Sequence, residues 1–133
     1  MSVRTALRIE LANQPGSLGT SLSQIAQAGV NLEAVAGVAT GETSILELLV
    51  ADPTAALQAL QQVGISATET QVAVVSLPHR VGALAHACEA LAGAGINIDG
   101  IYVVVTDASQ GAQVAFECPE ASHAEQVLAA ITF

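Results

Sequence analysis

The sequence of 133 residues contains no lysine and no tryptophan, only three arginines, and 2% aromatic residues. Twelve Asp and Glu side chains give it a formal net charge of −9. Such a chain lacks the basic stripe that collects nucleic-acid phosphates, so we expect no nucleic-acid partner. The hydrophobic fraction of 52% excludes an intrinsically disordered chain. The length predicts one ordinary domain or two very small ones, with an adequate core.

Long apolar segments are also missing. The mean hydropathy is +0.57, but no uninterrupted apolar run approaches the roughly 20 residues of a spanning helix. The amino-terminal residues MSVRTALRIE lack the apolar segment of a secretory signal. Cys88 and Cys118 show no C-x-x-C spacing and predict reduced, packed thiols. We therefore expect a cytoplasmic protein that does not associate with membranes.

The motifs of common enzymes are absent as well. The sequence contains no HExxH and no GxSxG, and a chain without lysine has no P-loop. The pair Gly93 and Gly95 is not completed by a third glycine at position 98, so there is no dinucleotide fingerprint. His79 and His86 have no third ligand at a fixed spacing. We expect no catalytic activity, no cofactor and no metal site.

What the sequence does contain is an internal repeat. A constant shift of 66 residues aligns the two halves. Glycine, asparagine and proline pairs on one shift are informative because turns and helix ends depend on these residues. We therefore predict two copies of one unit, residues 1–70 and 71–133. The identical pairs include Gly16 with Gly82, Gly29 with Gly95, Asn31 with Asn97, and Pro53 with Pro119.

The first copy predicts the element order βαββαβ. Its first strand alternates apolar and charged side chains, with Leu7 and Ile9 on one face and Arg8 on the other. Glycines end both helices, and Asp52 precedes a proline as an N-cap. The order is ferredoxin-like, an α+β fold with an antiparallel sheet and helices on one face. The predicted elements are strand 3–11, a helix ending at Gly29, strands 30–38 and 43–51, a helix from Pro53 to Gly64, and strand 65–71.

The second copy is one strand short. Its pattern is βαββα, because only three residues remain after the second helix. An unfilled sheet edge is an aggregation hazard. We predict that a second subunit or the extended amino-terminal strand covers this edge, and we expect a homodimer. The predicted elements are strand 71–77, helix 83–93, strands 96–106 and 112–118, and helix 119–130.

The repeated motifs resemble those of the ACT domain family. The first copy contains the segments Asn13-Gln-Pro-Gly-Ser-Leu18 and Ala28-Gly-Val-Asn-Leu32, and the second contains His79-Arg-Val-Gly-Ala-Leu84 and Ala94-Gly-Ile-Asn-Ile98. Nearly the whole chain is thus similar to a tandem ACT protein. The resemblance implies a non-catalytic regulatory protein that binds a small effector, usually an amino acid, and regulates a metabolic enzyme.

A carboxylate site can also be argued from the residues alone. A glycine loop at the start of a helix exposes backbone N–H groups at the positive end of the helix dipole. Asn13 or His79, which precede the glycines, can orient a polar ligand group. The amides of Asn31 and Asn97 can accept from an ammonium and donate to a carboxylate. An amino acid carries both groups.

The resemblance implies two quasi-equivalent sites, because in ACT pairs the loop of one unit faces the second strand of its neighbour. The first site would combine Asn13, Gln14, Gly16, Ser17 and Leu18 with Asn97 and Ile98. The second would combine His79, Arg80, Gly82, Ala83 and Leu84 with Asn31 and Leu32. The first is closer to the family, since His79 and Val81 replace the Asn and Pro of its loop. Arg80 offers a guanidinium that can hold a carboxylate bidentately.

Simpler interpretations of the same residues stay open. Gly16 and Gly82 could serve only a tight turn, and Asn31 and Asn97 could satisfy only local backbone groups. The alternative function is a protein-interaction scaffold or a regulatory subunit that has lost ligand binding. If an effector binds, the aromatic-poor composition around both loops favours a small or aliphatic amino acid.

Overall fold

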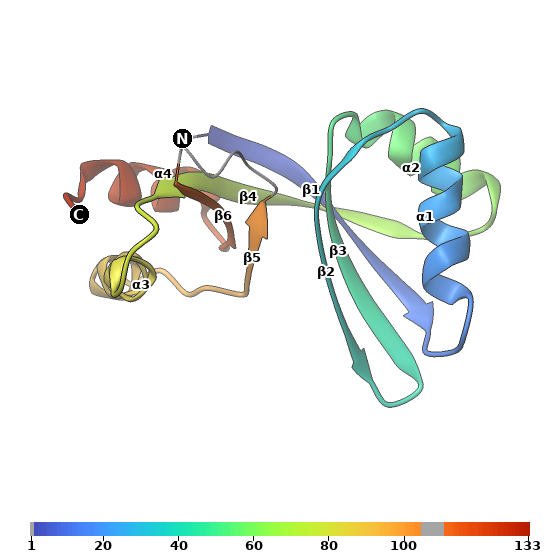
Figure 1. Cartoon of the computed structure of the whole chain (residues 1–133), viewed down its shortest axis with the longest axis horizontal. Coiled ribbons are helices and arrows are strands. Elements are labelled where there is room, and N and C mark those ends of the chain that lie inside the picture. The colour runs from blue at the N-terminus through green and yellow to red at the C-terminus, as the bar shows by residue number, and fades with distance from the viewer. Residues whose placement is uncertain (1, 105–110) are drawn as a thin grey trace. The chain divides into compact units, whose positions relative to one another are not determined.

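The computed structural model describes residues 2–104 and 111–133. It confirms the predicted α+β fold (Figure 1). The expected strands 65–71 and 71–77 are one uninterrupted strand, β4, which closes the first copy and opens the second. The elements are β1 (Ser2–Ala12), α1 (Ser17–Gln27), β2 (Leu32–Thr40), β3 (Thr43–Val50), α2 (Pro53–Gln62), β4 (Ala67–Leu77), α3 (Ala83–Gly93), β5 (Gly100–Val104), β6 (Ala112–Glu117) and α4 (Ala121–Ala130).

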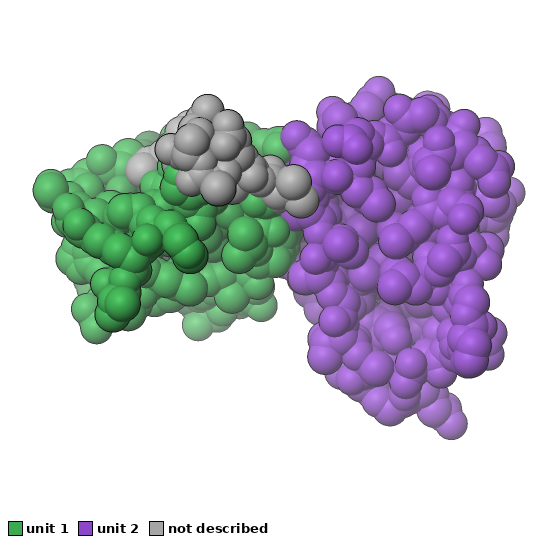
Figure 2. All heavy atoms as spheres, in the orientation of Figure 1, with its two compact units in different colours: residues 1–4, 71–133 green, residues 5–70 purple. Residues whose placement is uncertain are grey.

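The chain forms two compact units (Figure 2). The amino-terminal unit comprises residues 5–70, and the carboxy-terminal unit comprises residues 71–133 together with residues 1–4. Both β1 and β4 therefore contribute residues to each unit. No helix in the described part of the chain has the length and apolarity needed to cross a membrane.

In the amino-terminal unit, β3 pairs antiparallel with both β1 and β2. The alternation predicted for β1 is confirmed, because Leu7 and Ile9 are fully buried whereas Arg8 is exposed. Both helices pack on the face to which Leu7 and Ile9 point, as predicted. The buried core of this unit consists of Leu7, Ile9, Ile25, Val30, Leu46, Leu48, Val50, Ala56 and Leu60.

In the carboxy-terminal unit, β6 pairs antiparallel with β4 and β5. The strand order β2-β3-β1-β4-β6-β5 places β1 on the other side of β4, and residues 1–4 belong to this unit. The amino-terminal strand thus takes the edge for which the second copy has no strand of its own. This is one of the two coverings that the sequence suggested.

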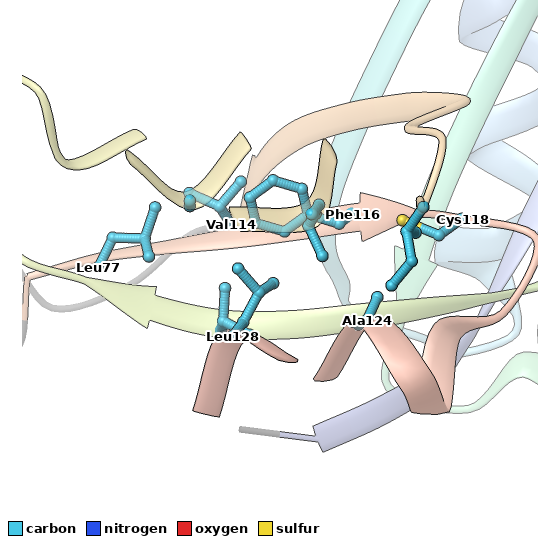
Figure 3. Packing of buried hydrophobic residues seen from close by; sticks show 11 residues of the cluster. Leu77, Val114, Phe116, Cys118, Ala124 and Leu128 are labelled. Atoms are coloured by element: carbon cyan, nitrogen blue, oxygen red, sulfur yellow. The ribbon is translucent and has the colours of Figure 1, made fainter. Parts of the chain in front are cut away.

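The core of the carboxy-terminal unit is built around Phe116, the largest of its fully buried side chains. Figure 3 shows Phe116 in one cluster with Val114 of β6 and Leu128 of α4. Cys118 belongs to the same cluster, and burial, followed by the nearby charges of Asp99 and Glu117, raises the pKa of its thiol. Both cysteines are free. The Cys118 thiol therefore stays protonated at neutral pH and packs as a small apolar group.

Several predicted element boundaries differ from the observed ones by one or two residues; β2, for example, spans Leu32–Thr40 and not 30–38. Two differences concern the second copy. The strand expected from residue 96 begins at Gly100. In the loop that precedes it, Asn97 Nδ2 donates to Asp99 Oδ1 at 2.7 Å. Its predicted end, residues 105 and 106, lies outside the described residues. The last helix begins at Ala121 and not at Pro119.

The late start of α4 has a cause in the repeat. In the first copy, Asp52 Oδ1 accepts from the Ala55 N–H at 3.1 Å, so α2 begins at Pro53 as predicted. Cys118 stands at the equivalent position of the second copy, and a thiol is a weak acceptor. The helix cap accordingly lies at Glu120, whose carbonyl accepts from the Ala124 N–H at 3.0 Å.

Candidate functional site

The two strand-to-helix loops have the same backbone geometry. Gly16 and Gly82 precede α1 and α3 with φ of 92° and 85°. In both loops the first helical N–H donates to a carbonyl three residues earlier at 3.3 Å, from Ser17 to Gln14 and from Ala83 to Arg80. The replacement of the family proline by Val81 therefore leaves the path of the second loop unchanged.

The left-handed conformation at Gly16 leads to a paired prediction. A Cβ at position 16 would meet nothing within 4 Å, so the cost of Gly16→Ala is conformational, and we expect the free energy of unfolding to fall by about 1 kcal/mol. Gly19 lies inside α1 with equally open space and no positive φ. Gly19→Ala should therefore raise the free energy of unfolding by roughly 0.5–1 kcal/mol.

Urea denaturation followed by circular dichroism measures both changes. Because the substitution is the same and the positions are three residues apart, opposite signs identify the backbone conformation as the cause. Changes of the same sign would contradict the assignment of a left-handed turn at Gly16.

Asn13 connects the first loop to a distant turn. Its backbone N–H donates to the Glu42 carbonyl at 2.8 Å, and its side-chain Nδ2 donates to the Gly41 carbonyl at 2.9 Å. Gly41 and Glu42 form the turn between β2 and β3. The side-chain NH₂ group that the sequence suggested for a ligand thus holds the tip of the β2–β3 hairpin.

A pocket of about 430 Å³ lies between this loop and the hairpin. It brings together four of the predicted residues, Asn13, Gln14, Ser17 and Leu18. The loop supplies most of the polar side chains, and the strands supply mainly apolar ones. No described lining residue is charged. The lining residues are Leu11, Ala12, Asn13, Gln14, Ser17, Leu18, Val35, Gly37, Val38, Ala39, Ser44, Ile45 and Leu46.

The hairpin wall of this pocket contains none of the residues predicted from the sequence. That wall comprises β2 residues 35 and 37–39 and β3 residues 44–46, all within the amino-terminal unit. One signal was available, because a glycine inside a strand marks a bulge or a close approach. At Gly37 a Cβ would lie 2.9 Å from Leu46 Cδ1. Because Gly37 has no side chain, the pocket keeps its space at this point of the hairpin wall.

Gly16 itself faces a different hollow. It lines a depression of about 390 Å³ on another side of the loop, together with Gln14, Pro15, Ser17 and Val63. Its contribution to the first pocket is therefore the turn that carries Ser17 and Leu18 into the lining.

The predicted residues on the second strands make local contacts within their own units. The Asn31 carbonyl accepts from the Ala51 N–H at 3.1 Å, and the Asn97 amide donates to Asp99. The side chains of Leu32 and Ile98 are partly buried against the two cores. The combination of a loop with an asparagine of the other copy stays a prediction.

The second loop is open to solvent. His79, Arg80 and Leu84 are exposed, whereas Ala83 is buried at the start of α3. Residues 106–109, which correspond to the hairpin tip of the first copy, lie outside the described residues. In the part of the chain that the structure describes, no three His, Cys, Asp or Glu side chains gather as metal ligands.

Comparison with known proteins identifies the family. The sequence model of the ACT domain pair matches residues 1–131. A protein structure from Bacteroides thetaiotaomicron is 28% identical, with a TM-score of 0.85 over 96% of this chain and 87% of that chain. The ligand-free regulatory subunit of aspartate kinase from Thermus thermophilus is 18% identical, with a TM-score of 0.66 over 97% of this chain and 96% of that chain. A search of curated proteins gives no match. With its repeated loops and a family match over nearly all residues, the chain belongs to the ACT domain family as an ACT domain pair.

Proposed function

We propose that this chain is a non-catalytic regulatory protein that binds a small or aliphatic amino acid and thereby controls a metabolic enzyme. The pocket between residues 11–18 and the β2–β3 hairpin is the observation that carries the proposal. Membership of the ACT family supports a regulatory role. One structural relative is a regulatory subunit of aspartate kinase, which supports a metabolic enzyme as the partner.

The pocket suits the chemistry of such a ligand. No side chain caps the first turn of α1. The Ser17 N–H donates to the Gln14 carbonyl, but the next N–H groups, those of Leu18 and Gly19, can donate to a carboxylate at the positive end of the helix. The hydroxyls of Ser17 and Ser44 can accept from an ammonium group. Leu18, Val35 and Val38 offer apolar surface to an aliphatic side chain. An uncharged lining disfavours a ligand with a charged side chain.

We also propose that the protein acts as a homodimer in the cytoplasm. β2 and β5 end the described strand order, and their exposed apolar side chains include Val38 at 63% and Val103 at 66%. Apolar edge strands of this kind tend to pair with another chain. The two free cysteines fit a reducing compartment. Light scattering coupled to size exclusion tests the dimer, and a monomeric mass at micromolar concentration would contradict it.

A thermal-shift screen against the common amino acids tests the function. A ligand at 100 times its Kd stabilises a folded protein by about 2.7 kcal/mol, so we expect a clear shift for one or a few small or aliphatic amino acids. The carboxamide derivative of each hit is the matched control, since it lacks the carboxylate and should shift the protein less. A screen without any shift would favour the scaffold alternative.

A further inference from the structure

Beyond the last β1–β3 pair, the loop wall of the pocket is tied to the hairpin tip by a single residue. Asn13 donates one hydrogen bond from its backbone and one from its side chain to two successive carbonyls, those of Glu42 and Gly41. Asn13 belongs to the loop wall, and the two carbonyls lie at the tip of the hairpin that forms the other wall. The side-chain bond spans 28 residues of sequence. At the hairpin tip, the distance between the two walls therefore depends directly on this residue, whereas Leu11 and Ala12 are held by the β1–β3 pairing.

The hairpin tip has few other restraints among the described contacts. The pairing of β1 with β3 ends at Ala12 and Thr43, and β2 pairs only with β3 because it is the last strand in the order. Residues 37–40 of β2 are exposed. The Thr40 and Thr43 hydroxyls, 3.3 Å apart, close the turn locally but do not tie it to the loop. Among the described contacts, Asn13 thus continues the pairing of β1 with the hairpin beyond Ala12, as far as Gly41 and Glu42.

The chemistry of this contact requires an amide at position 13. Backbone carbonyls only accept hydrogen bonds, and the Asn NH₂ group supplies a donor. An aspartate has almost the same shape but, when ionised, can only accept, so it would face the Gly41 carbonyl with a repulsive oxygen. A glutamine would place the donor one methylene further away.

We propose that Asn13 is a positioning residue that latches the hairpin tip to the loop and so holds the pocket in shape, and that it does not act as a ligand contact. The latch itself rests only on the geometry, whereas its effect on an effector rests on the proposed function. Effector binding and order at residues 40–43 are then coupled, and the coupling is reciprocal.

Backbone hydrogen exchange on the ligand-free protein tests the latch. A neutral hydrogen bond of this kind alters a local opening equilibrium by about two- to tenfold. We therefore expect Asn13→Asp and Asn13→Ala to accelerate exchange at residues 37–46 by that factor, while exchange in the cores stays unchanged. Circular dichroism verifies that both variants fold.

Gln14→Glu is the matched control. It makes the same amide-to-acid change at the next residue and on the same pocket wall, so it reproduces the added charge without touching the Gly41 carbonyl. Its hairpin should exchange as in the wild type. The proposal is wrong if Asn13→Asp leaves hairpin exchange unchanged, or if Gln14→Glu accelerates it equally.

Binding of the amino acids found in the screen provides the second measurement. A positioning role predicts that Asn13→Ala weakens all of them, and their carboxamides, by a common factor of up to about tenfold. A direct contact with the carboxylate would instead change the ratio between an amino acid and its carboxamide, and that result would overturn the proposal. If no amino acid binds the wild type, the proposed function fails, and the exchange experiment still decides whether the latch exists.

Discussion

Replacing Phe116 by alanine is expected to lower the free energy of unfolding by about 3–5 kcal/mol. The ring is fully buried in the carboxy-terminal core, so its removal leaves a cavity that the surrounding side chains fill only in part. A small domain often has a total stability of only about 5–15 kcal/mol. The variant should therefore unfold at a much lower urea concentration than the wild type.

The second phenylalanine of the chain provides the control. Phe133 is only partly buried and makes an edge-to-face contact with His86, with ring centroids 5.5 Å apart. Phe133→Ala should cost roughly 1 kcal/mol, which is the order of such a ring contact. Equal losses for the two variants would show that Phe116 does not centre this core.

The replacement Gly37→Val is expected to remove about half of the stabilisation by the effector. The new side chain would grow into the wall of the pocket, and its Cβ would lie 2.9 Å from Leu46 Cδ1. That atom is the end of a flexible side chain, so the strand can keep its path. A tenfold weaker Kd would reduce stabilisation at 100 times the wild-type Kd from about 2.7 to about 1.4 kcal/mol.

The repeat itself argues that the strand tolerates this change. Under the shift of 66 residues, Gly37 corresponds to Val103, which lies in β5 with its side chain exposed. Leu46 corresponds to the smaller Ala112 and lies in the core, so the unliganded variant should unfold somewhat below the wild-type temperature. Calorimetry in the presence and absence of the amino acid separates the two effects. An undiminished shift would place the effector outside this pocket.

The sequence predicted local structure best at residues that favour one backbone conformation or one position in a helix. Gly16 and Gly82 predicted two loops that share one backbone path, and Asp52 with Pro53 predicted the start of α2. The predicted start of α4 at Pro119 was wrong, because Cys118 takes the place of the capping Asp52 and its thiol is a weak hydrogen-bond acceptor. The start of the second helix of each copy was thus predictable for α2, where the capping atom is present, and not for α4, where it is missing.

The sequence predicted the loop wall of the candidate site but not the hairpin wall. Polar residues of the loop, such as Asn13 and Ser17, carry groups with obvious chemistry, and they do line the pocket. The opposite wall consists mainly of Val, Ala, Ile and Leu side chains, which are common in any strand. The hydrogen bonds from Asn13 to the hairpin depend on how two segments 28 residues apart meet. No pattern within one segment contains that information.

The sharing of β1 and β4 by both units has a consequence for the origin of this chain. The sequence repeat divides the chain near residue 70, as a duplication would, but the carboxy-terminal unit takes residues 1–4 from the first copy. A cut between Thr70 and Gln71 would divide β4 between two fragments. Residues 1–4 would stay on the amino-terminal fragment, although they belong to the carboxy-terminal unit. The copy that was duplicated and the unit that folds are therefore no longer the same piece of chain.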